Sequence, residues 1–364
     1  MTENTQKKTA PNSSTAIDAE QPSVKNNINI IPSNDTNSNI LNIISMTELF
    51  DSIYPPRIPI IDNFLYAGIY LFVGAPKVGK SFLMAQLAYH VSTGQNLWEY
   101  NTHQGTVLYM ALEDDYGRLQ NRLSKMFGTD STDDLYFATV SDQLGNGLEE
   151  QLKSFIRKYP KTKLIIIDTL QKIRESMSDK FSYANDYEVV TKLKKFTDEY
   201  KICLLLVHHT RKQTADDSFD TISGSNGLLG AADGAFILQK TKRIDGKATL
   251  DIAGRDQQDQ ILHLQFDKGT CVWKLTKVEN EISAPPPDPL LDKISKMVTP
   301  LEPKWTGTAS DLLALISDMD LQPNTLTRRL NISVDRLMNE YGITYENSRT
   351  RNGSQIKLSK IMKI

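Results

Sequence analysis

The segment Gly74-Ala75-Pro76-Lys77-Val78-Gly79-Lys80-Ser81 constrains the fold of this 364-residue chain more than any other feature. It fills every fixed position of the pattern G-x-x-x-x-G-K-[ST]. It also lies between an apolar run, "IYLFV", and a segment of helical periodicity, Ser81–Thr93. Glycines let backbone N–H groups surround phosphates, and the start of the following helix adds its positive dipole end. We therefore predict a strand, a phosphate-binding loop and a helix in direct succession.

This loop predicts that the chain binds a nucleotide, which we interpret as ATP with Mg²⁺. Lys80 would place a cation against the β- and γ-phosphate oxygens, and the Ser81 hydroxyl would ligate Mg²⁺. Asp168 ends the run "LIIID" at the strand edge where α/β sheets bind ligands, so its carboxylate is expected in the metal site. The alternative is an ordinary turn aspartate. The expected nucleotide contacts are Gly74, Ala75, Pro76, Lys77, Val78, Gly79, Lys80, Ser81 and Phe82. Nothing in the sequence reads the base, and GTP stays open.

Two further polar groups follow predicted strands and are candidates for catalysis. Glu113, in "LYMALEDD", follows the strand after the phosphate-loop helix, where a carboxylate can orient and deprotonate the attacking water. Asp114 and Asp115 are its rivals. His209, in "LLVHHTRK", is expected to sense the γ-phosphate, with His208 the less favoured of the pair.

Short, nearly continuous apolar runs alternate with segments of helical periodicity. The runs are Ile69–Val73, Thr106–Leu112, Lys163–Asp168 and Ile202–Val207, and the helical segments are Ser81–Thr93, Leu148–Tyr159 and Tyr187–Tyr200. Such runs fit strands buried on both faces of a parallel sheet. The alternation predicts an α/β fold with a mostly parallel sheet. After Ala235, shorter strand-like runs suit hairpins appended to that sheet.

Changes in composition predict four regions along the chain. Residues 1–43 are rich in Asn, Ser and Thr and are expected to be disordered. Residues 44–278 form the predicted ATPase domain. Residues 279–291 contain "SAPPPDP", a stretch incompatible with a helix, and are the predicted linker. Residues 292–364 form the predicted small C-terminal domain.

Bulk properties exclude several classes of protein. The formal net charge is −2, so the whole chain does not coat nucleic acid by charge alone. The two cysteines lie in apolar runs and indicate neither a disulfide framework nor a zinc site. No apolar run approaches the roughly 18–20 residues of a membrane helix, and no signal peptide is evident. We expect a cytoplasmic protein without a membrane partner.

Six segments between about Ile44 and Leu275 occur in a fixed order. They are "FVGAPKVGKSFLMAQLA", "GTVLYMALEDDYGRLQNRL", "LIIIDTLQKIR", "LLVHHTRK", "DSFDTISGSNGLLGAADGAFIL" and "AGRD". Together they resemble the RecA-like ATPases of the RepA type, the plasmid-encoded hexameric replicative helicases and their relatives on mobile elements. The resemblance implies a RecA-like fold, a homo-oligomeric ring, most simply a hexamer, with ATP between neighbours, and single-stranded DNA in the central pore. An initiator or primase is a possible further partner.

Carried over to this sequence, the resemblance makes Arg255 of "AGRD" an arginine finger that reaches the neighbouring subunit's ATP. It also makes Lys80, Glu113 and His209 the catalytic set around the phosphates. Such a finger makes hydrolysis depend on assembly. Several related rings carry a lysine two residues before the arginine, and here that position is Ala253. The alternative for Arg255 is a surface hairpin cation.

Two polar loops, Lys172–Asp186 and Arg211–Gly227, correspond to loops that face the pore in RecA-like rings. Their cations Lys180, Arg211 and Lys212 could meet DNA phosphates, although acids in the same loops also fit a merely solvated surface.

The C-terminal region carries a separate charge signal. From Arg328 onward there are eight cations and three acids, a local balance of 8 − 3 = +5. The cations are Arg328, Arg329, Arg336, Arg349, Arg351, Lys357, Lys360 and Lys363. Three helical segments followed by a hairpin with a basic tip indicate a winged-helix domain that binds duplex DNA, with Ser333–Tyr341 as recognition helix and Ser348–Gly353 as wing. A protein-binding module with a solvated basic face is the alternative.

These observations favour an ATP-hydrolysing, ring-forming DNA helicase, or a helicase-like replication protein, of a plasmid, phage or integrated element. Two alternatives stay open. One is an ATP-controlled DNA-binding switch or initiator without unwinding activity. The other is a recombination mediator that forms a filament, because ring and filament use the same kind of head-to-tail interface.

Overall fold

The computed structural model describes residues 41, 43–54, 57–174, 183–210, 219, 222, 226–240, 245–255, 259–280, 286–316, 321–350 and 353–361. The chain divides into two compact units, Met1–Leu49 and Phe50–Ile364. Helix α1 (Met46–Asp51) begins in the first unit, and Ser45 and Glu48 exchange capping hydrogen bonds at its start. All other described elements belong to the second unit.

A nine-stranded sheet forms the framework of the predicted ATPase region, in the order β11-β10-β9-β8-β3-β7-β6-β4-β5. Its parallel strands are β3 (Gly68–Gly74), β4 (Thr106–Ala111), β5 (Leu135–Ala138), β6 (Thr162–Asp168), β7 (Cys203–His209) and β8 (Gly234–Lys240). The antiparallel extension consists of β9 (Lys247–Gly254), β10 (Gln260–Asp267) and β11 (Val272–Asn280). A separate two-stranded ribbon pairs β1 (Pro59–Ile61) with β2 (Leu65–Tyr66).

Alternate residues of the central strands enter two apolar cores, one on each face of the sheet. On β3, Tyr70 and Phe72 belong to the core that also contains α2 and α3, whereas Ile69, Leu71 and Val73 belong to the other core. Every residue of β3 and β4 is buried. This burial on both faces is the reason why these strands read as continuous apolar runs.

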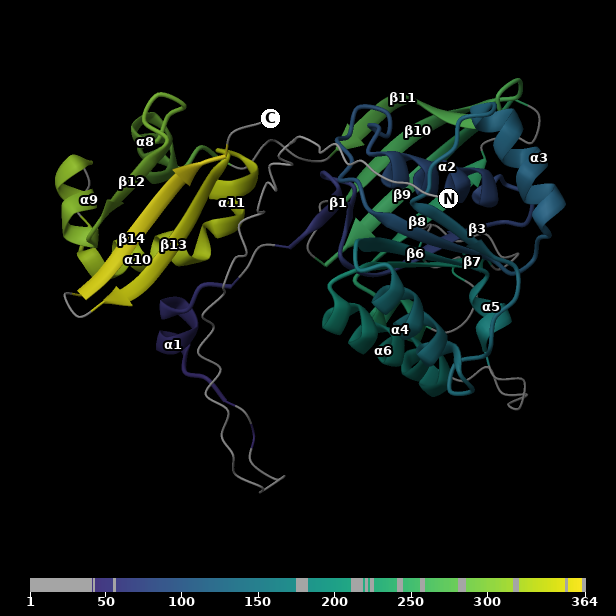
Figure 1. Ribbon diagram of the computed structural model, residues 1–364, viewed down its shortest axis with the longest axis horizontal. Coiled ribbons are helices and arrows are strands. Elements are labelled where there is room, and N and C mark those ends of the chain that lie inside the picture. The colour runs from purple at the N-terminus through teal and green to yellow at the C-terminus, as the bar shows by residue number, and fades with distance from the viewer. Residues whose placement is uncertain are drawn as a thin grey trace, which may run out of the picture. The chain divides into compact units, whose positions relative to one another are not determined.

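Helices cover both faces of this sheet (Figure 1). Helices α2 (Lys80–Thr93) and α3 (Tyr116–Phe127) pack on one face. On the other face lie α4 (Leu148–Lys158), α5 (Leu170–Ile173), α6 (Tyr183–Tyr200) and α7 (Asn226–Ala231). The expected α/β fold with a mostly parallel sheet is confirmed. No helix in the described part of the chain combines the length and the apolar character that a membrane span requires.

The C-terminal region forms its own apolar core between helices and a three-stranded antiparallel sheet of order β12-β14-β13. Its helices are α8 (Pro289–Met297), α9 (Ala309–Leu315), α10 (Pro323–Ile332) and α11 (Val334–Asn339). Its strands are β12 (Lys304–Gly307), β13 (Ile343–Thr350) and β14 (Gly353–Lys360). A reciprocal Thr308–Asp311 capping box starts α9.

Several elements depart from the sequence expectations. Helix α3 and strand β5 were not predicted. Helix α8 starts at Pro289, inside the expected linker, with the Asp288 carboxylate accepting from Leu290 N–H at its N-cap. The helix expected over Ser333–Tyr341 is only the six-residue α11, because Ser333 ends α10 and starts α11.

Candidate active site

The phosphate-binding loop joins the end of β3 to the start of α2. Gly79 has φ 108°, a left-handed conformation that favours glycine, and a Cβ there would lie 2.9 Å from the Trp273 ring. The indole Nε1–H of Trp273 donates to the Gly79 carbonyl at 3.2 Å. Gln86 on α2 exchanges two hydrogen bonds with the Trp273 backbone, at 2.9 and 2.8 Å. Strand β11 therefore holds the back of the loop.

Lys80 is the first residue of α2, directly after the loop, and is 7% exposed. Its Nζ donates to the carbonyls of Gly74 at 2.7 Å and Ala75 at 3.1 Å, and it lies 3.1 Å from His209 Nδ1. His209 reaches this point because β7 runs parallel to β3, with Gly74 opposite His209. Burial lowers the pKa of Lys80 to about 8, against the opposing charges of Asp168 and Glu113. Burial, and then the Lys80 charge, lower the pKa of His209.

Asp168 ends β6 beside the first turn of α2. Its Oδ2 accepts hydrogen bonds from Ser81 Oγ and from the Tyr109 hydroxyl, both at 2.9 Å. Burial raises the pKa of Asp168, while these two hydrogen bonds lower it. A serine hydroxyl adjoining a carboxylate supplies the hard oxygen donors that Mg²⁺ prefers. The predicted metal pair thus fits that ion, with Tyr109 as a partner that the sequence did not reveal.

Glu113 follows the end of β4, which pairs with β6 up to the level of Asp168. Its Oε1 accepts a hydrogen bond from Thr169 Oγ1 at 3.2 Å. Glu113 also faces the same pocket as Ser81 and Asp168. The carboxylate predicted to act on water therefore lies beside the predicted metal pair. Of its two rivals, Asp115 instead caps α3 by accepting from Arg118 N–H at 2.8 Å.

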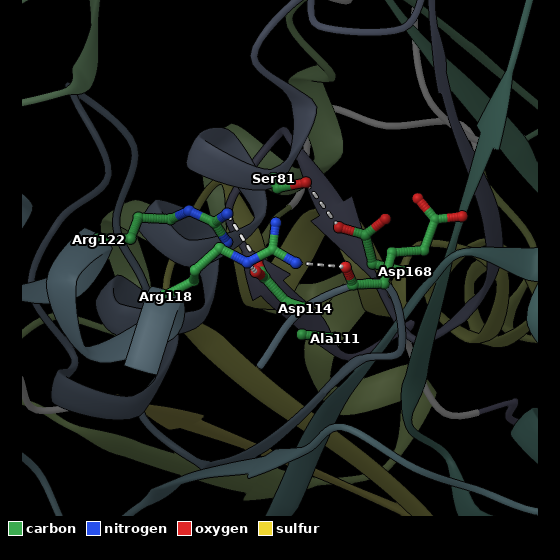
Figure 2. A pocket seen from close by; sticks show the side chains of 7 residues that line it. Ser81, Ala111, Asp114, Arg118, Arg122 and Asp168 are labelled. Carbon is green, nitrogen blue, oxygen red and sulfur yellow. Dashed lines mark hydrogen bonds and ion pairs between the residues drawn. The ribbon is translucent and has the colours of Figure 1, made fainter. Parts of the chain in front are cut away.

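This pocket, of about 160 Å³, is lined by Ser81, Ala111, Glu113, Asp114, Arg118, Arg122 and Asp168 (Figure 2). The two arginines come from α3 and converge on Asp114, with Arg122 Nη2 at 2.6 Å and Arg118 Nε at 3.2 Å. The Arg122 guanidinium also lies 5.3 Å from the centroid of the Phe82 ring. Sequence reasoning missed both arginines, because arginines four residues apart on a polar helix look like an ordinary solvated face.

Arg255 and the phosphate loop lie at opposite edges of the sheet, in the sense of opposite ends of its strands. The loop follows the end of β3, whereas Arg255 lies level with the start of β8. Strand β9 runs antiparallel to β8, so Gly254 pairs with Gly234 at the start of β8, whereas Leu238 of β8 pairs with Gly74. The Arg255 backbone N–H donates to the Asp233 carbonyl at 2.9 Å, and its exposed guanidinium donates to the Gly230 carbonyl. The structure thus brings together Lys80, Ser81, Glu113, Asp168 and His209, but not Arg255.

Among the described residues, four of the eight cations counted in the C-terminal region have an acidic partner. Arg336 pairs with Glu340 at 2.8 Å and Lys357 lies 3.8 Å from Glu346. The counted excess of cations falls further because two acids from outside the counted segment take part. Asp51 pairs with Arg328 at 2.7 Å, and Asp288 pairs with Arg329 at 3.0 Å.

Several predicted DNA contacts lie outside the described residues. They are Lys180, Arg211 and Lys212 of the expected pore loops, and Arg351 at the tip of the expected wing. The predicted disordered tail, residues 1–43, lies outside them apart from residues 41 and 43.

Residues 37–215 match the AAA domain family. The matched region contains the phosphate loop, Glu113, Asp168 and His209, but not Arg255. No curated protein matches the chain. Among solved structures, an ATPase domain aligns with a TM-score of 0.49 and 16% sequence identity, over 58% of this chain and 85% of that one. A DnaB-like replicative helicase, described with its interactions with primase, aligns with the same TM-score and identity, over 58% of this chain and 59% of that one.

Proposed function

We propose that the protein is an ATP-hydrolysing, ring-forming DNA helicase, or a helicase-like replication protein, of a mobile element. One observation carries the proposal. Lys80, Glu113 and Asp168 lie at one edge of the sheet and Arg255 lies at the opposite edge, so that a site containing all four groups needs two subunits.

At the first edge, the residues around the loop have the chemistry that ATP hydrolysis requires. Lys80 supplies a charge to the β- and γ-phosphate oxygens, and Glu113 accepts a proton from the attacking water. Ser81 and Asp168 would hold Mg²⁺, which neutralises charge on the phosphate oxygens when it is bound. His209, in contact with the Lys80 ammonium at 3.1 Å, would register whether the γ-phosphate is present.

At the second edge, Arg255 is too far away to reach the ATP of its own subunit. The register places Gly254 four residues below Leu250, which lies level with Leu238 and Gly74. At the rise of an extended strand, these four residues span about 13 Å along the sheet, before the lateral distance is added. An arginine at this edge can complete only a neighbour's site, and a ring of such subunits, most simply a hexamer, closes every interface.

The C-terminal region supports a DNA substrate through its topology. Its order of one helix, a strand, two helices packed together and then a hairpin, with sheet order β12-β14-β13, resembles that of a winged helix once α11 is set aside as an addition. We propose α10 as the recognition helix of this arrangement, in place of the segment Ser333–Tyr341 predicted from the sequence. We propose that this domain contacts duplex DNA while the ring acts on a single strand, with an initiator or primase as loading partner.

Strand displacement on a forked DNA with ATP and Mg²⁺ tests this function. Wild type should unwind the fork, whereas Glu113→Gln should bind ATP normally but lose about 10²- to 10⁴-fold in hydrolysis, the usual contribution of a general base. Lys80→Ala should lose both binding and hydrolysis. Full ATPase activity in Lys80→Ala would overturn the site assignment.

Ala253 gives a specific reason to keep a second candidate, an ATP-controlled DNA-binding switch. It pairs with Ala235, and where related rings carry a lysine this position supplies no second cation beside Arg255. Hydrolysis would then be slow and would reset the oligomer instead of driving unwinding. ATP-dependent DNA binding without strand displacement, also in the presence of a loading partner, would favour this candidate.

A further inference from the structure

Residues Phe50 to Ile53, which precede the first strand of the ATPase region, lie against the C-terminal region. Asn331 Nδ2 on α10 donates to the Phe50 carbonyl at 3.0 Å. One turn earlier on α10, Arg328 Nε donates to Asp51 Oδ1 at 2.7 Å. The Ile53 side chain packs against the apolar core of the C-terminal region. A backbone contact, an ion pair and an apolar contact therefore hold the same four residues.

Asn331 is a buried polar residue of the C-terminal region that uses the docked segment as a hydrogen-bond partner. Its side chain is only 4% exposed, and its Oδ1 accepts a hydrogen bond from the Tyr345 hydroxyl at 2.8 Å. A buried amide needs partners at both its oxygen and its nitrogen. The Phe50 carbonyl satisfies the nitrogen end. Farther along the chain, the Arg57 backbone N–H donates to the carboxylate of Asp335 in the first turn of α11.

The helix that receives this segment is α10, which we have proposed as the recognition helix. Helix α10 follows α9 and packs against it, as the second helix of a helix-turn-helix does. Its first turn presents Asn324 and Thr325 to solvent, and Arg328 follows on the next turn. In such a helix, polar and basic side chains meet phosphates and base edges. Here Arg328 meets the carboxylate of Asp51 instead.

We propose that Phe50–Ile53 form a strap that competes with duplex DNA for helix α10. This inference rests on the proposed role of the C-terminal region in DNA binding. The Asp51 carboxylate takes the place of a DNA phosphate against Arg328, and the Phe50 carbonyl covers the adjoining turn. Duplex DNA gains full access to α10 only when the strap leaves.

The chemistry of these contacts makes the strap releasable. The side chains of Arg328 and Asp51 are 42% and 56% exposed, and an ion pair of such exposure holds weakly. The hydrogen bond from Asn331 to the Phe50 carbonyl fixes where the strap docks, but a single hydrogen bond does not prevent its release. The strap therefore lowers DNA affinity by the fraction of molecules in which it is docked.

A charge-matched pair of full-length variants tests the competition. The variant Asp51→Lys with Ile53→Ser removes the ion pair and the apolar anchor of the strap. The control is Glu340→Lys with Leu315→Ser, which has the same charge change and loses an apolar side chain, but alters residues that the strap does not contact. Glu340 instead pairs with Arg336 within α11. Fluorescence anisotropy with a labelled mixed-sequence duplex gives Kd for each form.

We expect the strap variant to bind the duplex about two- to tenfold more tightly than the control, because release of a weakly held competitor is worth up to about a factor of ten. Equal affinities of the two variants would overturn the strap. Absence of DNA binding by every form would overturn the DNA role of the C-terminal region itself, so the two failures are distinguishable.

Hydrogen–deuterium exchange provides a readout that does not depend on the variants. In wild type, duplex DNA should accelerate exchange in peptides that cover residues 50–54, because the strap is displaced while α10 becomes protected. Slower exchange in both segments on addition of DNA would mean that strap and duplex bind together, which contradicts competition.

Discussion

The hydroxyl of Tyr109 offers a sharp test of how the metal pair is held. Tyr109 is fully buried in β4, and its hydroxyl donates to Asp168 Oδ2 at 2.9 Å. In Tyr109→Phe the ring fills the same space, but Asp168, itself 7% exposed, loses one of the two hydrogen bonds described for its Oδ2. Removal of a hydrogen bond to a charged group costs about 1.5–3 kcal/mol when little water can replace it.

The direction of the effect follows from the pKa of Asp168. Burial raises this pKa, so the ionised carboxylate costs stability at neutral pH, and each hydrogen bond offsets part of that cost. Loss of the Tyr109 bond should raise the pKa further. The free energy of unfolding should therefore fall by about 1.5–3 kcal/mol, and the ATPase should need more Mg²⁺, with a larger deficit at lower pH.

Differential scanning calorimetry of the ATPase transition and a Mg²⁺ titration of ATP hydrolysis measure the two effects. A loss of this size lowers Tm by about 2–4 °C per kcal/mol in a domain of this size. Tyr345→Phe is the matched control, because it also removes a buried tyrosine hydroxyl but from a neutral acceptor, Asn331. It should leave the Mg²⁺ requirement unchanged. If Tyr109→Phe had the Mg²⁺ dependence of wild type, Tyr109 would be a packing residue only.

Two other predictions concern the ends of the divided site. The Kd for ATP should rise as pH increases through about 8, because burial lowers the pKa of Lys80 to about 8 and the neutral amine no longer attracts phosphate. The variant Lys80→Arg stays charged and should not show this rise. If Lys80→Arg had the same pH profile of Kd as wild type, the assignment of Lys80 to the phosphates would be contradicted. Arg255→Ala should lower kcat about 10³-fold or more, and mixing it with Glu113→Gln should restore activity at about a quarter of the interfaces, since each interface takes one group from each subunit. Two inactive variants that stay inactive when mixed would show that Arg255 does not act on a neighbour.

The parallel core was predictable because its strands are buried on both faces and therefore lack polar interruptions. The phosphate loop was predictable for a related reason, since its spacing is fixed by chemistry. Helix α3 escaped prediction because its buried face is narrow, with Leu119 and Met126 as its buried residues. Its boundaries were nevertheless marked, by Asp115 as N-cap and Gly128 as C-cap.

Side-chain partners across the sheet were beyond the reach of sequence patterns. Tyr109 lies in an apolar run, where a tyrosine reads as core, and nothing local shows that its hydroxyl reaches Asp168. The charge of the C-terminal region was overestimated for a similar reason. A count along the sequence omits Asp51 and Asp288, which the fold brings to Arg328 and Arg329.

The contact between Trp273 and Gly79 has a consequence for the synthesis of the protein. The two residues are separated by 194 positions, and Gln86 is separated from Trp273 by 187. During translation the phosphate loop emerges early, but the strand that supports it emerges only after the rest of the sheet. A nascent chain that ends within the matched region 37–215 already contains the loop, Glu113, Asp168 and His209, yet lacks the indole behind Gly79. The stretch that is recognisable by sequence is thus shorter than the stretch that must be made before the phosphate loop has all of its contacts in the folded protein.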